Sequence, residues 1–118
     1  LIELSQKVRP GINIFIAELI ATFGLIFVIF GSLRGGKLTV ASSVATYITA
    51  GYWFTSSTSF ANPAVTVARQ FSDTFTGISP SGVPTFIIAQ IFGAILGFIV
   101  INIPYYLLKY ALFPILIL

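Results

Sequence analysis

Two groups of residues in this chain could do chemistry, and both lie inside apolar sequence. The first is Asn62-Pro63-Ala64, within the run Ser-Phe-Ala-Asn-Pro-Ala-Val-Thr. Asparagine is a preferred N-cap and proline favours the first helical turn, so we predict that a helix begins at Pro63. Lipid offers no partner for the free backbone groups of such a helix start. A re-entrant segment beside a water-filled path is the exception, so these residues indicate a pore.

The second candidate is Glu18, a carboxylate well inside the first long apolar stretch. An ionisable side chain at membrane depth is costly and is functional by default. One interpretation makes Glu18 the coupling site of a small ion-coupled transporter. The other makes it a fixed support for a neighbouring loop in a channel.

Catalytic chemistry is poorly supported by the composition. The chain contains no cysteine and no histidine, and its carboxylates are Glu3, Glu18 and Asp73. This removes thiolate ligands, the commonest metal ligand and the commonest general base. We therefore expect no enzyme, no metal and no other cofactor. A net charge of +3 without a basic run also argues against nucleic-acid binding.

The elements that must hold these residues are apolar helices. Hydrophobic residues make up 57% of the chain and charged residues 8%, against about a quarter in soluble domains. We predict an all-α membrane protein with three transmembrane helices and one re-entrant half-helix. The full spans are predicted at 12–33, 38–55 and 84–108, and the half-helix at 63–71. Residues 1–11 are predicted to be an interfacial segment, 12–108 the membrane repeat, and 109–118 an apolar tail too short to cross.

The order of these features resembles one half of an aquaporin, a member of the major intrinsic protein family. A buried glutamate, a second span, the Asn-Pro-Ala motif, and a third span with Ala-Gln and glycines follow one another between about 15 and 97. The resemblance implies two inverted repeats whose half-helices meet at the bilayer midplane. It also implies a passive channel for water or small neutral solutes, assembled as a tetramer in the plasma membrane.

The resemblance assigns roles to individual residues. Asn62 would donate hydrogen bonds to the passing solute, and the half-helix would direct its positive end at the pore. Glu18 would bind backbone N–H groups of the re-entrant loop, and Gln90 would also contact that loop. Gly93 and Gly97 form a small-xxx-small face for close helix packing.

The selectivity constriction is where this sequence departs from the family. Second repeats usually place arginine three residues after the Asn of the motif, a position held here by Val65. Arg69 follows one turn later, about 6 Å further along the helix. It would line a wider vestibule, or pair with Asp73, or both. The predicted constriction is wide and resembles that of glycerol- or metalloid-conducting members; its positions are Ala50 or Gly51, Ser59, Val65 and Arg69.

One repeat cannot enclose a pore, so we expect a second half. It could belong to the same longer chain, to an inverted copy, or to a separate half-chain. The absence of methionine favours a fragment of a longer polypeptide, and the C-terminal half of a channel ranks first. The ion-coupled transporter remains the runner-up, and a structural subunit of a membrane complex is the third class.

Overall fold

The computed structural model describes the backbone of residues 2–117 and the side chains of residues 2–104, 106 and 107. All regular elements within residues 2–117 are helices, and this part of the chain contains no β-strand. The elements, in chain order, are α1 (Ile12–Ser32), η1 (Leu33–Gly35), α2 (Gly36–Phe54), α3 (Pro63–Arg69), η2 (Pro80–Gly82) and α4 (Val83–Ile117).

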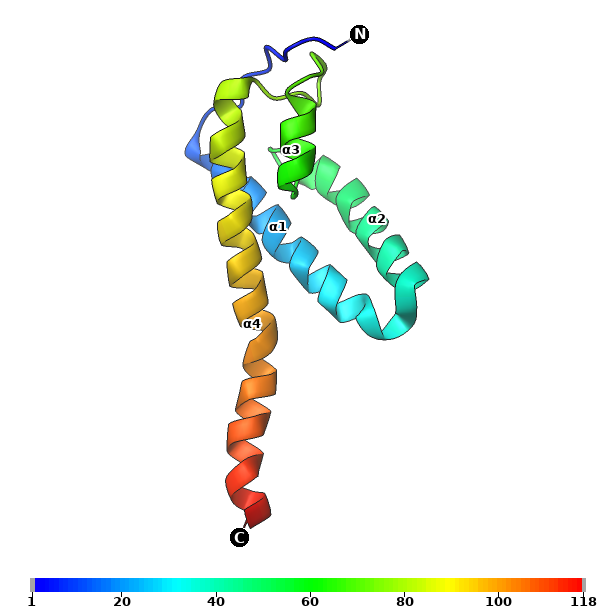
Figure 1. The fold of residues 1–118 in the computed structure, drawn as a ribbon, viewed down its shortest axis with the longest axis vertical. Helices are drawn as coiled ribbons and strands as arrows, with labels where there is room; N and C mark the ends of the chain where they lie inside the picture. Colours follow the sequence, from blue (N-terminus) through cyan, green and yellow to red (C-terminus); the bar gives the residue numbers. More distant parts are fainter. Residues whose placement is uncertain (1, 118) are drawn as a thin grey trace.

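Helices α1 and α2 form a tight antiparallel hairpin (Figure 1). The short 3-10 turn η1 reverses the chain, and Gly36 adopts a φ of 82° that favours glycine. The stretch Ile12–Phe54, which contains both helices, is long and apolar enough to cross a bilayer, as is Pro80–Pro104. The predicted second span, 38–55, differs from α2 by no more than two residues at either end.

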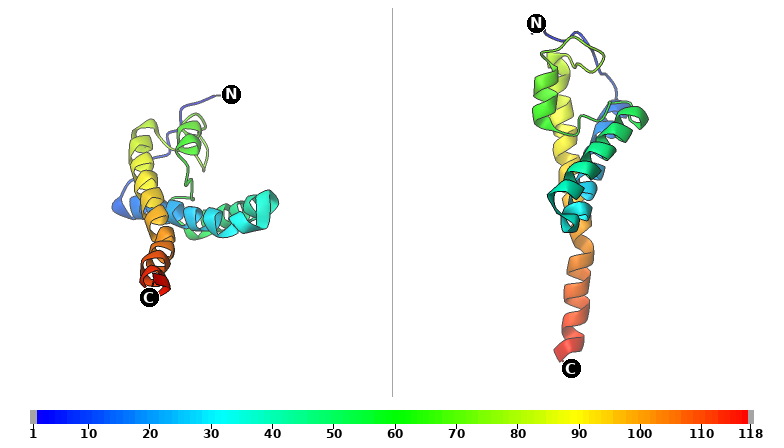
Figure 2. Two further views of the ribbon diagram at one scale, coloured as in Figure 1. Left: turned by 60° about the horizontal axis from the view of Figure 1, so that its bottom comes forward. Right: turned by 90° about the vertical axis from the view of Figure 1, so that its right-hand side faces the viewer.

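Helix α4 is the longest element, and α1 crosses it closely (Figures 1 and 2). Glycines allow this approach. A Cβ atom added at Gly93 would collide with the Leu19 carbonyl oxygen, and one at Gly97 would lie 2.9 Å from Ile26 Cβ. Small residues let two helix backbones approach each other, so van der Waals contact extends along the crossing.

Helix α3 lies beside the N-terminal half of α4, on the side toward which the α1–α2 hairpin projects (Figure 2). It ends at Arg69, two residues before the predicted end at Phe71. The last turn tightens instead of continuing: the Phe71 N–H donates to the Ala68 carbonyl, three residues back, at 3.1 Å. The carbonyls of Gln70 and Phe71 accept from the N-terminal segment, from the Ser5 N–H at 2.8 Å and from the Glu3 N–H at 3.3 Å.

The two ends of the chain differ from the expected segments. Residues 3–9 run along the loop that follows α3 and are hydrogen bonded to it, with Ser5 buried. Helix α4 continues without interruption to Ile117, through most of the predicted tail 109–118. The tail's side chains and residue 118 lie outside the described residues, so its predicted interfacial role stays a prediction.

Candidate functional site

The loop between α2 and α3 has an unusual backbone. Thr58, Ser59 and Ala61 have φ values of 63°, 49° and 49°, in the left-handed region that side chains with a Cβ disfavour. Each such residue costs about 1 kcal/mol or more, so the surrounding structure must hold the loop in place. All three residues are buried.

Glu18 supplies part of that support from the middle of α1. Its Oε1 accepts hydrogen bonds from the Ala61 N–H and from Gln90 Nε2, the latter at 2.9 Å. Its Oε2 accepts from the Phe60 N–H at 3.3 Å. The residue is fully buried, so three donors from a loop and a second helix compensate for a carboxylate removed from solvent.

Gln90 extends this network from α4 to α3. Its Nε2 also donates to Thr66 Oγ1 at 2.7 Å, and the Thr66 hydroxyl donates to the Asn62 carbonyl at 3.0 Å. One buried amide therefore connects α1, α3 and α4. Gln90 lies about 10 Å along α4 from its first residue, so the start of α3 is held part-way along an apolar helix.

Asn62 caps α3 and keeps its amide nitrogen free. Its Oδ1 accepts from the Ala64 N–H at 2.8 Å and from the Val65 N–H at 3.4 Å. Its Nδ2 makes no hydrogen bond to the described residues, and the side chain is exposed. Pro63 and Ala64 are exposed beside it. The structure thus presents two N–H donors at the positive end of a short helix.

Two guanidinium groups stack on the ring of Phe60, next to this motif. Arg69 Cζ lies 4.4 Å from the ring centroid, and Arg9 Cζ lies 5.0 Å from it. Arg69 does not pair with Asp73, because no ion pair joins them and the Asp73 carboxylate accepts instead from the Gln6 N–H at 2.9 Å. That predicted pair is wrong: a tertiary contact with the N-terminal segment holds Asp73. Arg69 Nη1 is buried and makes no hydrogen bond within the described part of the chain.

Arg9 makes the densest set of contacts to the loops around the motif. Its guanidinium donates to three carbonyl oxygens, those of Gly77 at 2.8 Å, Ser57 at 3.0 Å and Phe75 at 3.0 Å. Burial, and next the neighbouring Arg69, lower the pKa of Arg9 from its ordinary value. Arginine nonetheless remains charged at neutral pH, so both cations are present beside Phe60.

The predicted constriction residues lie in different environments. Ala50 is exposed on α2, and Val65 is partly buried at the start of α3. Gly51 and Ser59 are buried against each other, since a Cβ added at Gly51 would lie 2.7 Å from Ser59 Oγ. The Ser59 side chain thus faces α2. The carbonyl oxygens of residues 58–61 accept no hydrogen bond from any described group.

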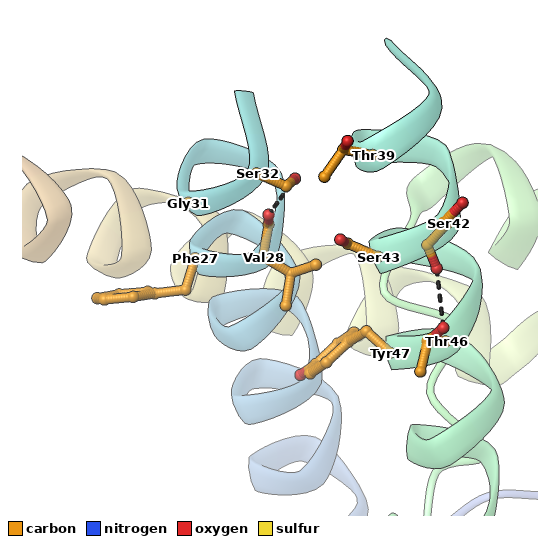
Figure 3. A pocket seen from close by; sticks show the side chains of 9 residues that line it. All are labelled: Phe27, Val28, Gly31, Ser32, Thr39, Ser42, Ser43, Thr46 and Tyr47. Atoms are coloured by element: carbon orange, nitrogen blue, oxygen red, sulfur yellow. Dashed lines mark hydrogen bonds between the residues drawn. The ribbon is translucent and has the colours of Figure 1, made fainter. Parts of the chain in front are cut away.

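A separate open groove of about 710 Å³ lies near the hairpin turn, away from the motif. Figure 3 shows its hydroxyl-bearing lining on both helices. Ser32 and Thr46 donate back to carbonyls of their own helices, those of Val28 at 2.6 Å and Ser42 at 2.9 Å. Such bonds satisfy hydroxyls locally, so these residues need no ligand.

Sequence reasoning missed several residues of this site. The roles of Arg9, Phe60 and Thr66 depend on partners far away in the sequence, such as Ser57 for Arg9 and Gln90 for Thr66. The only local signal was an arginine in a segment otherwise expected to lie at the membrane interface.

Comparison with known proteins gives one informative match. The chain is 48% identical over 94 residues to "Aquaglyceroporin AqpS" from Rhizobium meliloti (strain 1021). The match covers 80% of this chain and 40% of the relative, so the chain spans less than half of that protein's length. No family model and no solved structure matches the chain. The similarity to this relative, together with the apolar helices, shows that the chain belongs to the aquaporin (major intrinsic protein) family.

Proposed function

We propose that this chain is one half of a passive membrane channel for water and small neutral solutes such as glycerol. In this proposal α1, α2 and the N-terminal part of α4 cross the bilayer, and α3 is a re-entrant half-helix that begins inside it. The family relationship supports a channel, because the relative is named as an aquaglyceroporin. The observation that carries the proposal is the exposed Asn62 amide at the start of α3, which buried hydrogen bonds hold part-way along α4.

The chemistry of the site suits an uncharged solute. The free Asn62 amide offers N–H donors, and the carbonyls of residues 58–61, which directly precede it in the chain, accept no hydrogen bond from the described residues. Water and polyols use both kinds of partner at once. The positive end of α3, together with Arg9 and Arg69, disfavours cations.

A second half completes the pore in this proposal. The exposed face formed by Asn62, Pro63 and Ala64 has no covering element in the described chain, and a helix start at membrane depth needs one. The second half belongs to the same longer chain, to an inverted copy, or to a separate half-chain. Complete pores assemble as tetramers in the plasma membrane, as the family resemblance implies.

We infer a wide selectivity region rather than a strict water filter. Val65 occupies the position at which second repeats of the family usually carry arginine. The arginine of this helix, Arg69, lies over the Phe60 ring. Ala50 adds no bulk on α2. Glycerol-sized and metalloid solutes are therefore the expected cargo in addition to water.

The contacts of Glu18 argue against the transporter alternative. A coupling carboxylate must exchange protons during transport, whereas three N–H donors occupy Glu18 in a fully buried position. Uptake driven by a proton gradient and abolished by Glu18→Gln would support the transporter and refute the channel.

The test compares water, glycerol and arsenite fluxes in proteoliposomes by stopped-flow light scattering. Asn62→Asp is the informative variant, because aspartate caps a helix as well as asparagine but has no amide N–H donors. We expect it to lower glycerol flux by about tenfold, because the solute loses roughly one hydrogen bond to the channel. Asn13→Asp is the matched control, since Asn13 is exposed near the start of α1.

Each outcome has a defined meaning. Downhill flux that Asn62→Asp reduces and Asn13→Asp preserves supports the channel and a self-assembled pore. Flux equal to that of empty liposomes refutes self-assembly, and co-reconstitution with a candidate second half then tests the other two arrangements. Flux that is insensitive to Asn62→Asp contradicts the role given to this motif.

A further inference from the structure

We propose that Arg9 is a positioning residue for the pore loop, and that its guanidinium sets the solute selectivity of the channel. This inference rests on the proposed function. The N-terminal segment thereby forms part of the pore machinery, although it lies outside every membrane helix. Arg9 acts through the loop backbone and Phe60, and no direct contact with the solute is required.

The contacts of Arg9 join three parts of the chain that surround the motif. It binds the carbonyl of Ser57, at the start of the strained loop, and those of Phe75 and Gly77, in the loop after α3. Its guanidinium also stacks on Phe60, directly before Ala61-Asn62. A single side chain therefore fixes the loop before the half-helix relative to the loop after it.

Arg9 and Glu18 hold the same loop with opposite chemistry. Glu18 accepts from the N–H groups of Phe60 and Ala61, whereas Arg9 donates to the carbonyl of Ser57. Neither residue alone fixes both kinds of backbone group. Because the loop contains residues in the left-handed region, it is expected to relax if either support is removed.

Arginine is required here rather than any cation. The planar guanidinium directs its N–H groups outward in one plane, so one group reaches three carbonyls while its face rests on an aromatic ring. A lysine ammonium has three donors at one point and no flat face. Arg9→Lys should therefore retain the charge near the pore mouth but lose the positioning.

The backbone of the segment around Arg9 supports the same arrangement. The Ser79 N–H donates to the Lys7 carbonyl at 2.8 Å, and the Ser5 N–H binds the end of α3. Lys7 itself provides a matched control, because its Nζ lies 5.3 Å from the Phe75 ring and its side chain makes no described hydrogen bond.

The first measurement is hydrogen exchange of the loop amides in the full chain, reconstituted in lipid. We expect Arg9→Gln to accelerate amide exchange at Phe60 and Ala61 by about 10- to 100-fold, because the loop loses its charge-assisted hydrogen bonds to Arg9. Lys7→Gln should leave these rates unchanged. Unchanged rates in Arg9→Gln would overturn the proposal, and this readout does not depend on any flux.

The second measurement is the ratio of glycerol to water flux at equal amounts of folded protein. A purely structural role would lower both fluxes together, whereas a positioning role changes their ratio by about threefold or more, equivalent to roughly 0.7 kcal/mol of discrimination. If Arg9→Gln does not fold, Arg9→Lys replaces it. Wild-type exchange and flux ratio in Arg9→Lys would overturn the proposal. A wild-type chain without flux refutes self-assembly of the pore, and the exchange experiment still decides the role of Arg9.

Discussion

Replacing Glu18 with glutamine tests the central support of the loop, because the two side chains have nearly the same shape. Glutamine keeps one carbonyl oxygen, which can still accept from Ala61 and Gln90, as Oε1 does in the wild type. The second oxygen becomes an NH₂ group that faces the Phe60 N–H. Two donors then oppose each other in a buried site.

The expected cost follows from these contacts. Leaving the buried Phe60 N–H without an acceptor costs about 1–3 kcal/mol, and the two remaining hydrogen bonds lose the contribution of the charge, about 1 kcal/mol each. Removal of a buried charge offsets part of this loss. We therefore expect Glu18→Gln to lower the free energy of unfolding by about 2–4 kcal/mol.

The assay is unfolding by SDS titration in mixed micelles, followed by circular dichroism. Glu3→Gln is the matched control, since Glu3 is an exposed carboxylate outside the helices. It should change the free energy of unfolding by no more than about 0.5 kcal/mol. Equal stability of the Glu18→Gln and Glu3→Gln proteins would refute the reasoning, because it would mean that the hydrogen bonds of Glu18 do not contribute to the free energy of unfolding.

Two further substitutions test the helix packing. Gly93→Ala places a Cβ against the Leu19 carbonyl, so we expect a loss of about 1–3 kcal/mol in the same titration, whereas Gly31→Ala, with nothing within 4 Å, should be neutral or stabilising. A destabilisation at Gly93 no larger than at Gly31 would contradict the close approach of α1 and α4. Tyr47→Phe removes a 2.8 Å hydrogen bond from its hydroxyl to an α1 carbonyl, and should cost about 1 kcal/mol. Tyr52→Phe, whose hydroxyl makes no described hydrogen bond, is its control, and equal effects would refute the assignment.

Local chemistry made parts of this structure predictable. Proline after an N-cap residue fixes a helix start, and α3 begins at Pro63 with Asn62 as its cap. Long apolar runs with few charges indicate spans, and the first predicted span differs from α1 by one residue at its end. These features depend on residues that are close in the sequence, so they can be predicted from the sequence alone.

Contacts between segments that are distant in the sequence could not be predicted from these local signals. Nothing in the periodicity of residues 3–9 indicates that this segment lies along the loop after α3 and donates to the carbonyls of Gln70 and Phe71. The stacking of Arg69 on Phe60 in place of a pair with Asp73 also depends on where the N-terminal segment lies.

The sequence therefore specified where the apolar helices and the start of α3 lie, because hydropathy, capping and proline geometry act within a few residues. Tertiary packing determined which groups the buried polar side chains contact. A carboxylate or guanidinium removed from solvent must find enough donors or acceptors to offset its desolvation, and these partners come from distant parts of the chain. In this chain, folding brings Glu18 and Arg9 to opposite kinds of backbone group on one strained loop.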